Sequence, residues 1–350
     1  MYYGQLQHQQ NMLQDSIRTG MYQYAFMQNT EDFTGASVLD VGTGTGLLAF
    51  FSAQAGARKV YAVEHAESMA DMAKLLVKGN HLEHVIEVVI GSLEKTNLPE
   101  KVDIIVSEPI GFLLVHERML ESFIAARDMY LKPGGLMMPS TSDIIVAPFT
   151  DETLFNEQNT KSNFWENSAF YGIDLSPLAE KAKQENMSQA VVGYFSSDIL
   201  ISCDKAKHVI DFRTVSLKEL QTFEIPVNFR ITRTSLLHGL ACWFDAHFLG
   251  TTSHVTLTTA PDQPGTHWYQ CRLLLREPIA VNASQTVSGT MKFVASTKTS
   301  YMITLNLTLD GTHITSTNTI NLQDQMYHYL QSQAAATPGG SNDQASGYNY

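Results

Sequence analysis

The stretch that decides the fold is Ser37-Val38-Leu39-Asp40-Val41-Gly42-Thr43-Gly44-Thr45-Gly46. Its first five residues form a short apolar run, which is typical of a buried parallel strand. The three glycines that follow let the backbone approach a ligand closely, and residues 47–55 have helical composition. Strand, glycine turn and helix together predict a doubly wound α/β domain with its ligand at the carboxyl end of this strand.

The spacing of the glycines narrows the kind of ligand. A dinucleotide-binding fingerprint would need its third glycine at position 47, where the chain has Leu47. The next predicted strand, residues 59–63, ends at Glu64, where an acid can bond the hydroxyls of a ribose. A glycine-rich turn alone is a weak signal, since a tight connection needs no ligand. Asp40 before the turn and Glu64 after the second strand favour a nucleoside-containing ligand.

Two glutamates follow another apolar run. Glu108 and Glu117 come directly after residues 102–106, which read as a further buried parallel strand. Both carboxylates are therefore expected beside the ligand crevice. A pair of carboxylates suits a planar cation with several donors, and guanidinium is such a group. The alternative is that both are surface acids, or that Glu117 is an N-terminal charge on a helix running through Met129.

The two halves of the chain have different patterns of predicted secondary structure. Strands near 37–41, 59–64, 85–90 and 102–107 alternate with helices near 46–56, 66–79 and 116–130, which is a doubly wound pattern. Beyond Pro139 the chain has short alternating runs such as residues 301–309, closed by the hairpin signal Asp310-Gly311. We expect two domains, residues 1–138 and a mostly β region at 139–330, followed by a disordered tail at 331–350.

Composition limits the class of protein. The chain has 350 residues and 44% hydrophobic content, enough for two domains with cores of their own. Its three cysteines are too few and too scattered for a disulfide framework or a zinc site, so we expect no metal and a reducing compartment. No leader and no membrane-spanning apolar run is evident, which predicts a soluble intracellular protein. The net charge of −12 disfavours direct nucleic-acid binding and favours basic partners, although solubility alone can explain an acidic chain.

Five ordered segments together resemble a protein arginine methyltransferase, most closely the coactivator-associated type I subfamily of histone-arginine methyltransferases. The resemblance runs from Tyr3 to about residue 330, and it is carried by residues 9–20, the turn at 37–46, residues 61–64, the two-glutamate segment and Thr266-His267-Trp268-Tyr269-Gln270. It implies a class I methyltransferase Rossmann-like domain with N-terminal lid helices, followed by a β-barrel domain with an inserted helical dimerisation arm at about 163–189.

The resemblance also implies a function. The cofactor would be S-adenosyl-L-methionine, and the products would be mono- and asymmetric dimethylarginine in proteins such as histones and RNA-binding proteins. A homodimer in the nucleus and cytoplasm would carry out the reaction. Two rival interpretations stay open: an inactive scaffold that has lost cofactor affinity, and a methyltransferase for small molecules.

Site residues follow from the same resemblance. Glu108 and Glu117 would hold the target guanidinium, while His267 and Asp15 would take the departing proton or hold a helix over the site. Arg18 would bind the cofactor's carboxylate and Glu94 its adenine amino group. The full set of expected cofactor contacts is Gln9, Arg18, Asp40, Gly42, Gly44, Glu64, Glu94 and Ser122.

Four further residues are expected at the substrate or at the control of the product: Tyr3, Met12, Met119 and Trp268. Met12 and Met119 would crowd the target nitrogen, although methionine at helical spacing usually fills a core. Trp268 would either face the target arginine or pack in the core. Because the family's Tyr-Phe pair before Tyr3 has no counterpart, we expect a shorter lid over the adenine. Phe112 and His116 depart from the family pattern, but both carboxylates remain.

The segment at 163–189 is rich in aromatic and apolar side chains, among them Phe164-Trp165 and Phe170-Tyr171. Such a group inserted in a β domain indicates a surface that needs a partner. The alternative is that these side chains fold back onto their own barrel.

Overall fold

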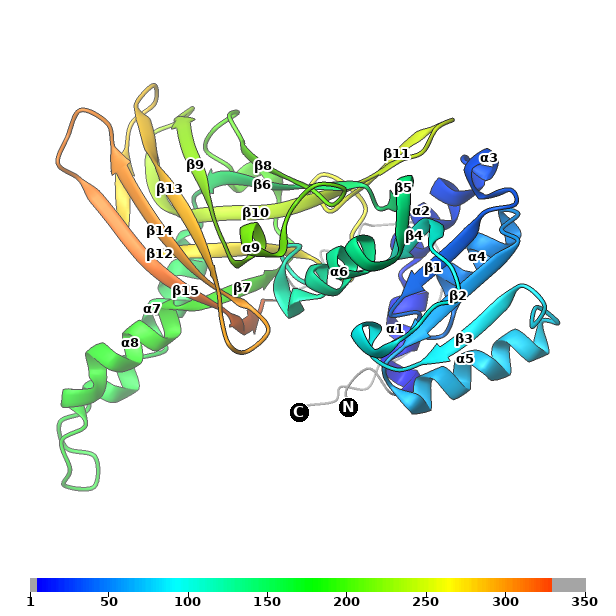
Figure 1. Ribbon diagram of the computed structural model, residues 1–350. Helices are drawn as coiled ribbons and strands as arrows, with labels where there is room; N and C mark the ends of the chain where they lie inside the picture. The colour runs from blue at the N-terminus through cyan, green and yellow to red at the C-terminus, as the bar shows by residue number, and fades with distance from the viewer. Residues whose placement is uncertain (1–4, 329–350) are drawn as a thin grey trace, which may run out of the picture.

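The computed structural model describes residues 5–328, which form an α/β domain joined to a β domain (Figure 1). The α/β domain contains a five-stranded parallel sheet in the order β3-β2-β1-β4-β5. Its strands are β1 (Ser37–Val41), β2 (Lys59–Glu64), β3 (Ile86–Ile90), β4 (Val102–Ser107) and β5 (Leu131–Met138). Its helices are α1 (Leu6–Gln14), α2 (Ser16–Met27), α3 (Thr30–Phe33), α4 (Leu47–Gln54), α5 (Glu67–Gly79) and α6 (Leu120–Tyr130).

Strand β1 lies at the centre of this sheet. All five of its residues are buried, as expected of a parallel strand covered on both faces. It pairs with β2 on one side and with β4 on the other, so the turn after β1 and the loop after β4 leave the same edge. The α/β expectation is therefore confirmed, and the glycine turn and the two glutamates meet at one edge because of this strand order.

The N-terminal helices pack across that edge. Asp15 separates α1 from α2 and caps α2 by accepting a hydrogen bond from the main-chain N–H of Arg18 at 2.9 Å. The buried ring of Tyr22 packs edge-on against Phe248, and its hydroxyl donates to the carbonyl of Ser107 at 3.1 Å. These contacts fix α2 against the end of β4 and thereby place the side chain of Arg18 over the glutamates.

The β domain is one strongly curved sheet that bends into a barrel, with order β8-β6-β10-β12-β7-β15-β14-β13-β9 and β11 paired to β10 (Figure 1). Burial alternates along strands such as β14, where every second side chain faces the barrel interior. The predicted hairpin signal lies between β14 and β15, where Gly311 has a φ of 75°. The strands are β6 (Thr141–Phe149), β7 (Gln189–Gly193), β8 (Ala206–Asp211), β9 (Thr222–Arg230), β10 (Ser235–Leu249), β11 (His254–Thr258), β12 (Gln270–Val281), β13 (Thr286–Ala295), β14 (Tyr301–Leu309) and β15 (Thr315–Tyr327).

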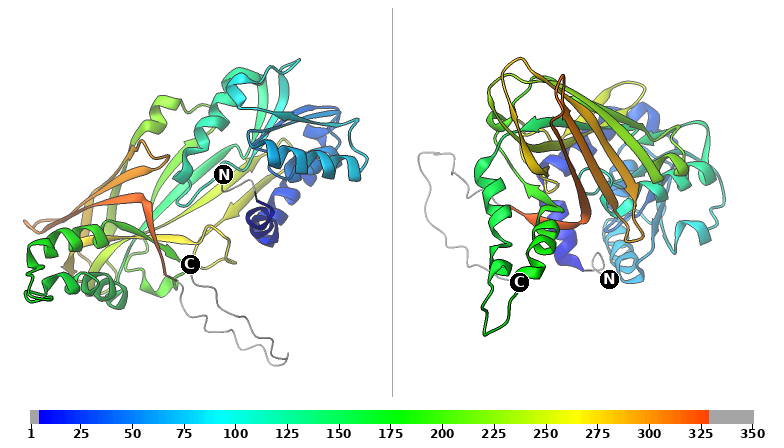
Figure 2. Two further views of the ribbon diagram at one scale, coloured as in Figure 1. Left: turned by 90° about the horizontal axis from the view of Figure 1, so that it is seen from below. Right: turned by 90° about the vertical axis from the view of Figure 1, so that its left-hand side faces the viewer.

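A helical arm projects from the barrel, away from the α/β domain (Figures 1 and 2). It consists of α7 (Glu152–Thr160), the short helices at Asn163–Glu166 and Ser176–Leu178, and α8 (Ala179–Met187). The arm starts earlier than the predicted residue 163, because Asp151 caps α7 through the main-chain N–H of Leu154. Its tip is apolar and exposed: Phe164 is 53%, Tyr171 92% and Ile173 62% exposed.

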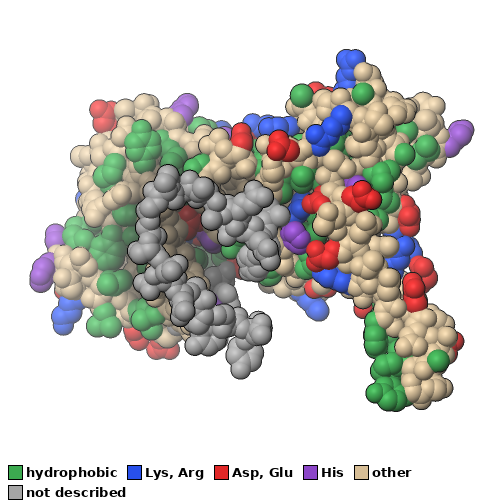
Figure 3. Space-filling view, turned by 180° about the vertical axis from the view of Figure 1, so that it is seen from behind, with side chains coloured by type: hydrophobic (Ala, Val, Ile, Leu, Met, Phe, Trp, Pro, Cys, Tyr) green, Lys and Arg blue, Asp and Glu red, His purple; other side chains and the backbone are tan. Residues whose placement is uncertain are grey.

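These side chains contribute to a hydrophobic edge on the arm (Figure 3). They pack on one another, with the Phe164 and Phe170 rings 5.4 Å apart, and do not fold back onto the barrel. The exposure of these side chains therefore argues against the alternative in which they fold back onto their own barrel.

Other parts of the described chain bear on organisation. Sheet strand β5 ends at Met138 and the first barrel strand, β6, begins at Thr141. The helix α9 (Leu217–Gln221) lies beside α6, at the junction of the two domains. Within residues 5–328, no helix is both long and apolar enough to span a membrane. The predicted tail at 331–350 lies outside the described residues.

Candidate active site

A cavity of about 1210 Å³ opens at the carboxyl edge of the parallel sheet, between the N-terminal helices and the barrel. Its walls come from α1, the glycine turn, the double-glutamate loop (residues 108–119), the loop at 265–269 and the end of β15. The predicted site residues that line it are Gln9, Met12, Asp15, Arg18, Gly42, Gly44, Glu64, Glu108, Glu117, Met119 and His267.

The glycine turn forms one side of this cavity. All three of its glycines have positive φ, 57° at Gly44, a conformation that favours glycine. The Gly44 N–H donates to Oε2 of Glu64 at 2.9 Å, and a Cβ placed on Gly44 would lie 2.9 Å from the side-chain oxygen of Gln9. The glycine turn, Glu64 and Gln9 of α1 thus lie around one narrow part of the cavity, which we call the cradle.

This cradle fits a nucleoside. Each carboxylate oxygen has two acceptor positions, so Glu64 can still accept hydroxyl groups while bonded to the main chain. The bare backbone of Gly44 lets a ligand approach the turn closely, beside the amide of Gln9. Gln9, Gly44 and Glu64 would therefore hold the nucleoside part of a cofactor such as S-adenosylmethionine.

Asp40 lies beneath the turn and outside the cavity wall. It is fully buried, and the hydroxyl of Thr43 donates to its Oδ2 at 2.5 Å. Burial raises the pKa of Asp40 to about 7, against the opposing effect of hydrogen bonds from Thr43 and the main chain of Ala49. The structure thus gives Asp40 a supporting position in which it holds the turn, in place of the predicted direct contact with the cofactor.

Two other described residues of the predicted set, Ser122 and Trp268, also fall outside the lining. Ser122 is exposed on α6 and is not among the residues that line the cavity. Trp268 is 2% exposed, its indole N–H donates to the carbonyl of Ile110 at 3.0 Å, and it packs on Phe244, so the core-packing interpretation describes it better. Tyr3 lies outside the described residues, as does the side chain of Glu94.

Glu108 is paired with Arg18 inside the cavity. Nη2 and Nε of Arg18 donate to Oε2 of Glu108 at 2.8 and 3.2 Å, and the two side chains are 11% and 10% exposed. The resemblance assigns Arg18 to the cofactor's carboxylate, whereas here this arginine occupies the predicted substrate carboxylate. Its Nη1 donates only a long bond, at 3.4 Å, to the carbonyl of Met12. A guanidinium of the protein itself therefore binds the carboxylate that is expected to hold a substrate guanidinium. Glu108 can thus bind a group of this kind in this position.

The double-glutamate loop has an unusual backbone. Leu113, Leu114, Glu117 and Arg118 all have positive φ, with 70° at Glu117. Non-glycine residues adopt this region rarely, and they cluster at functional sites where the surroundings hold them. The predicted helix over 116–130 is therefore shorter, since α6 begins only at Leu120. Glu117 lies before that helix and lines the cavity, which argues against the helix N-terminal interpretation.

The barrel holds this loop in place. Arg118 donates to the carbonyl of Ser296 at 2.7 Å and to the side chain of Gln221 at 3.0 Å. The ring of His116 bonds the hydroxyl of Ser300 at 2.9 Å, and burial lowers its pKa to about 4. His116 is therefore neutral near pH 7, and it anchors the loop to the hairpin between β13 and β14.

His267 and Asp15 form the predicted pair. Nδ1 of His267 lies 2.7 Å from Oδ2 of Asp15, and the His267 main-chain N–H donates to the same oxygen at 2.8 Å. Burial opposes ionisation of Asp15, but these bonds and the Arg18 N–H together hold its pKa below the usual value. A carboxylate on Nδ1 leaves Nε2 as the acceptor of the imidazole ring. The pair can therefore accept a proton and also fix the junction of α1 and α2.

Met12 and Met119 both line the cavity, from the last turn of α1 and from the residue before α6. This placement is compatible with the predicted role in product control. Three residues that the sequence interpretation did not single out also line it, namely Tyr194, Gln325 and Tyr327. Tyr194 follows β7, and the other two come from the end of β15, which returns parallel to β7. No local motif marks such a contact.

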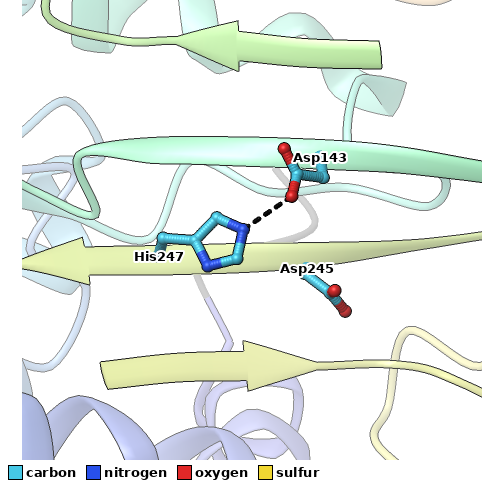
Figure 4. A group of neighbouring side chains, drawn as sticks. All are labelled: Asp143, Asp245 and His247. Atoms are coloured by element: carbon cyan, nitrogen blue, oxygen red, sulfur yellow. Dashed lines mark hydrogen bonds and ion pairs between the residues drawn. The ribbon is translucent and has the colours of Figure 1, made fainter. Parts of the chain in front are cut away.

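One group of side chains in the described part of the chain could hold a metal ion. Asp143, Asp245 and His247 lie on β6 and β10 with ligand atoms within 4.8 Å of one another (Figure 4). Nε2 of His247 already lies 2.8 Å from Oδ2 of Asp143, and the ammonium of Lys207 pairs with the same carboxylate. The group lies outside the cavity lining, and a lysine already supplies its cation.

Comparisons with known proteins agree with this geometry. A model of a methyltransferase domain matches residues 38–135, and a model of the arginine methyltransferase oligomerization subdomain matches residues 141–313. The histone-arginine methyltransferase CARMER of Drosophila ananassae is 46% identical over 346 residues, which are 99% of this chain and 64% of that protein. The chain thus spans about 64% of the length of the curated relatives it matches.

Solved structures match over nearly their whole length. Protein arginine methyltransferase 10 of Arabidopsis thaliana is 34% identical with a TM-score of 0.83, covering 91% of this chain and 99% of that one. The Trypanosoma brucei PRMT1 enzyme-prozyme complex with AdoHcy gives 31% identity and a TM-score of 0.82, covering 92% of this chain and 100% of that one. The chain therefore belongs to the protein arginine methyltransferase family.

Proposed function

We propose that this protein transfers methyl groups from S-adenosyl-L-methionine to guanidinium nitrogens of protein arginines and forms asymmetric dimethylarginine. One observation carries the proposal: a single cavity joins a nucleoside cradle at Gly44 and Glu64 to two carboxylates, Glu108 and Glu117. The two hydrogen bonds that Arg18 donates to one oxygen of Glu108 support guanidinium as the second ligand. The solved Trypanosoma brucei relative with AdoHcy supports the choice of cofactor.

The residues of the chain divide the work. The cofactor, when bound, supplies an electrophilic methyl group on a sulfonium. Glu108 and Glu117 would accept hydrogen bonds from the target guanidinium and draw its positive charge away from the reacting nitrogen. His267, with Nδ1 turned to Asp15, would accept the proton that leaves this nitrogen as the N–C bond forms. Arg18 would turn from Glu108 to the cofactor's carboxylate.

Partners and compartment are part of the proposal. The CARMER proteins are named histone-arginine methyltransferases, which supports histones as substrates. RNA-binding proteins as further substrates, and a place in the nucleus and cytoplasm, belong to the same proposal. The acidic charge of −12 favours such basic chains. The exposed apolar arm and the matching oligomerization subdomain support a homodimer. We assign residues 1–138 to the cofactor and 139–330 to the substrate and the dimer.

The test is a methylation assay with labelled S-adenosylmethionine and histones, followed by acid hydrolysis and separation of the methylarginines. Label in asymmetric dimethylarginine is expected. Label only in the symmetric isomer would leave the arginine methyltransferase proposal standing and overturn the type I assignment.

A catalytically weak scaffold is the second candidate, because Arg18 already occupies Glu108. Calorimetry with S-adenosylhomocysteine separates the two candidates: a scaffold would bind no cofactor, whereas an enzyme must release Arg18 on binding it.

A further inference from the structure

The end of β15, residues 325–328, has two faces that contact different parts of the molecule; we call it the β15 terminus. Gln325 and Tyr327 line the cavity, and the Tyr327 ring packs edge-on to Phe112 of the double-glutamate loop with centroids 6.0 Å apart. Because side chains alternate along a strand, Met326 and His328 face the other way. They lie against α7 and Lys161 at the root of the arm, and neither lines the cavity.

The root of the arm, helix α7 and its cap Asp151, is connected to this second face through the buried side chain of Arg272. Asp151 caps α7 with one carboxylate oxygen and pairs through the other with Nη1 of Arg272 at 2.7 Å. Arg272 is 1% exposed, and its Nη2 lies 3.2 Å from Nδ1 of His328. Arginine can only donate, so Nδ1 must accept, and Nε2 lies 3.4 Å from a carboxylate oxygen of Glu157 on α7. His328 therefore bridges a buried guanidinium to helix α7.

The backbone of the terminus is held equally closely. A Cβ on Gly193 of β7 would lie 2.1 Å from the carbonyl oxygen of His328, so only glycine allows this approach. The sulfur of Met326 lies 2.6 Å from the amide nitrogen of Gln158 and 2.8 Å from the ammonium of Lys161. The β15 terminus is thus clamped between β7 and α7, and its position depends on both.

We propose that the β15 terminus couples the root of the arm to the substrate wall of the cavity, with Met326 and His328 as positioning residues for Tyr327. The inference rests on the proposed function for its substrate, an arginine-containing protein segment. A shift of α7, such as docking of the arm on a second copy would impose, moves His328 and hence the wall that Tyr327 contributes. Substrate affinity would then respond to the arm, whereas the cofactor cradle on the parallel sheet would not.

The test uses the full chain with three variants. His328→Ala removes the bridge, His328→Gln keeps one acceptor and one donor group, and His313→Ala changes an exposed histidine in the turn before β15. His328→Ala should raise KM for an arginine-rich histone peptide roughly tenfold, the lower end of what one lost hydrogen bond to a charged group predicts, with kcat and S-adenosylhomocysteine affinity unchanged. His328→Gln should restore KM, and His313→Ala should not change it.

A double-mutant cycle distinguishes positioning from general damage. If His328 acts through Tyr327, then His328→Ala should add little to KM once Tyr327→Ala is present. Independent, additive effects would overturn the proposal, and so would equal losses in kcat and cofactor affinity. Should His328→Ala fail to fold, Glu157→Gln tests the same bridge from its exposed end and should raise KM about twofold.

Hydrogen exchange separates this inference from the proposed function. In His328→Ala, but not in His313→Ala, amide exchange should rise both at 325–328 and at the double-glutamate loop, since Tyr327 contacts Phe112. A native protein that methylates no arginine would defeat the proposed function alone. Unchanged exchange in the loop would defeat the coupling, whatever the activity.

Discussion

Replacing Glu108 by glutamine should tighten cofactor binding while it stops methyl transfer. In the structure, Arg18 gives two of its donors to one oxygen of Glu108, at 2.8 and 3.2 Å, with both side chains about one-tenth exposed. A cofactor carboxylate can bind Arg18 only by drawing it away from this pair. Hydrogen bonds to charged groups contribute about 1.5–3 kcal/mol, and glutamine keeps the acceptor oxygen but loses the charge. About half of that energy, roughly 1 kcal/mol, should therefore be released, which is about a fivefold lower Kd.

The measurement is calorimetric titration with S-adenosylhomocysteine, which lacks the sulfonium charge that Glu108 would attract in its own right. Glu117→Gln is the matched control, because it removes the same charge from the same loop, and its Kd should stay within about twofold. A Kd for Glu108→Gln that is unchanged or higher would refute the idea that Arg18 is shared between Glu108 and the cofactor.

Four further outcomes are expected. Glu117→Gln should lower methyl transfer roughly 100-fold or more, since it loses charge and orientation at the target nitrogen; near-native single-turnover rates would contradict its role. Ile173→Asp, 62% exposed on the arm in the native chain, should give a monomer in sedimentation with weakened activity, whereas a fully active monomer would make the arm only architectural. The pKa of Asp15 is lowered in the folded protein, so its contribution to stability is present above about pH 3.8 and is lost as the pH falls through the folded-state pKa. The difference in unfolding free energy between the native chain and Asp15→Asn should therefore become smaller in acid. A difference that does not vary with pH would count against the His267 contact. Met12→Phe should divert product from asymmetric dimethylarginine toward monomethyl or symmetric forms, and an unaltered product ratio on hydrolysis would remove Met12 from product control.

The parts of the fold that follow from local patterns could be predicted from the sequence. The run at 37–41 and its glycines define β1 and the turn without any distant partner, and the alternation at 301–309 defines a barrel strand in the same way. Since the ends of parallel strands share an edge, the meeting of Glu64 with the glutamate loop follows as well.

Contacts between distant segments could not be predicted in this way. The Arg18–Glu108 pair joins residues 90 positions apart, and nothing near either one indicates which anion the arginine meets when no cofactor is bound. The left-handed backbone at Glu117 is imposed by its surroundings, so helical composition misled the expectation there. The burial of Asp40 and the return of β15 beside β7 likewise depend on how whole elements pack.

The anchoring of the double-glutamate loop by Arg118 and His116 has a consequence for anyone who wishes to recombine this protein with its relatives. The double-glutamate loop is encoded in the first half of the chain, but its shape is held by Ser296, Ser300 and Gln221 of the second half. A chimera joined at the domain boundary near residue 140 would take the loop from one parent and the residues that hold it from the other. A chimera that takes its barrel from a relative should therefore fold well only if the 296–300 hairpin and α9 come from the same parent as the double-glutamate loop.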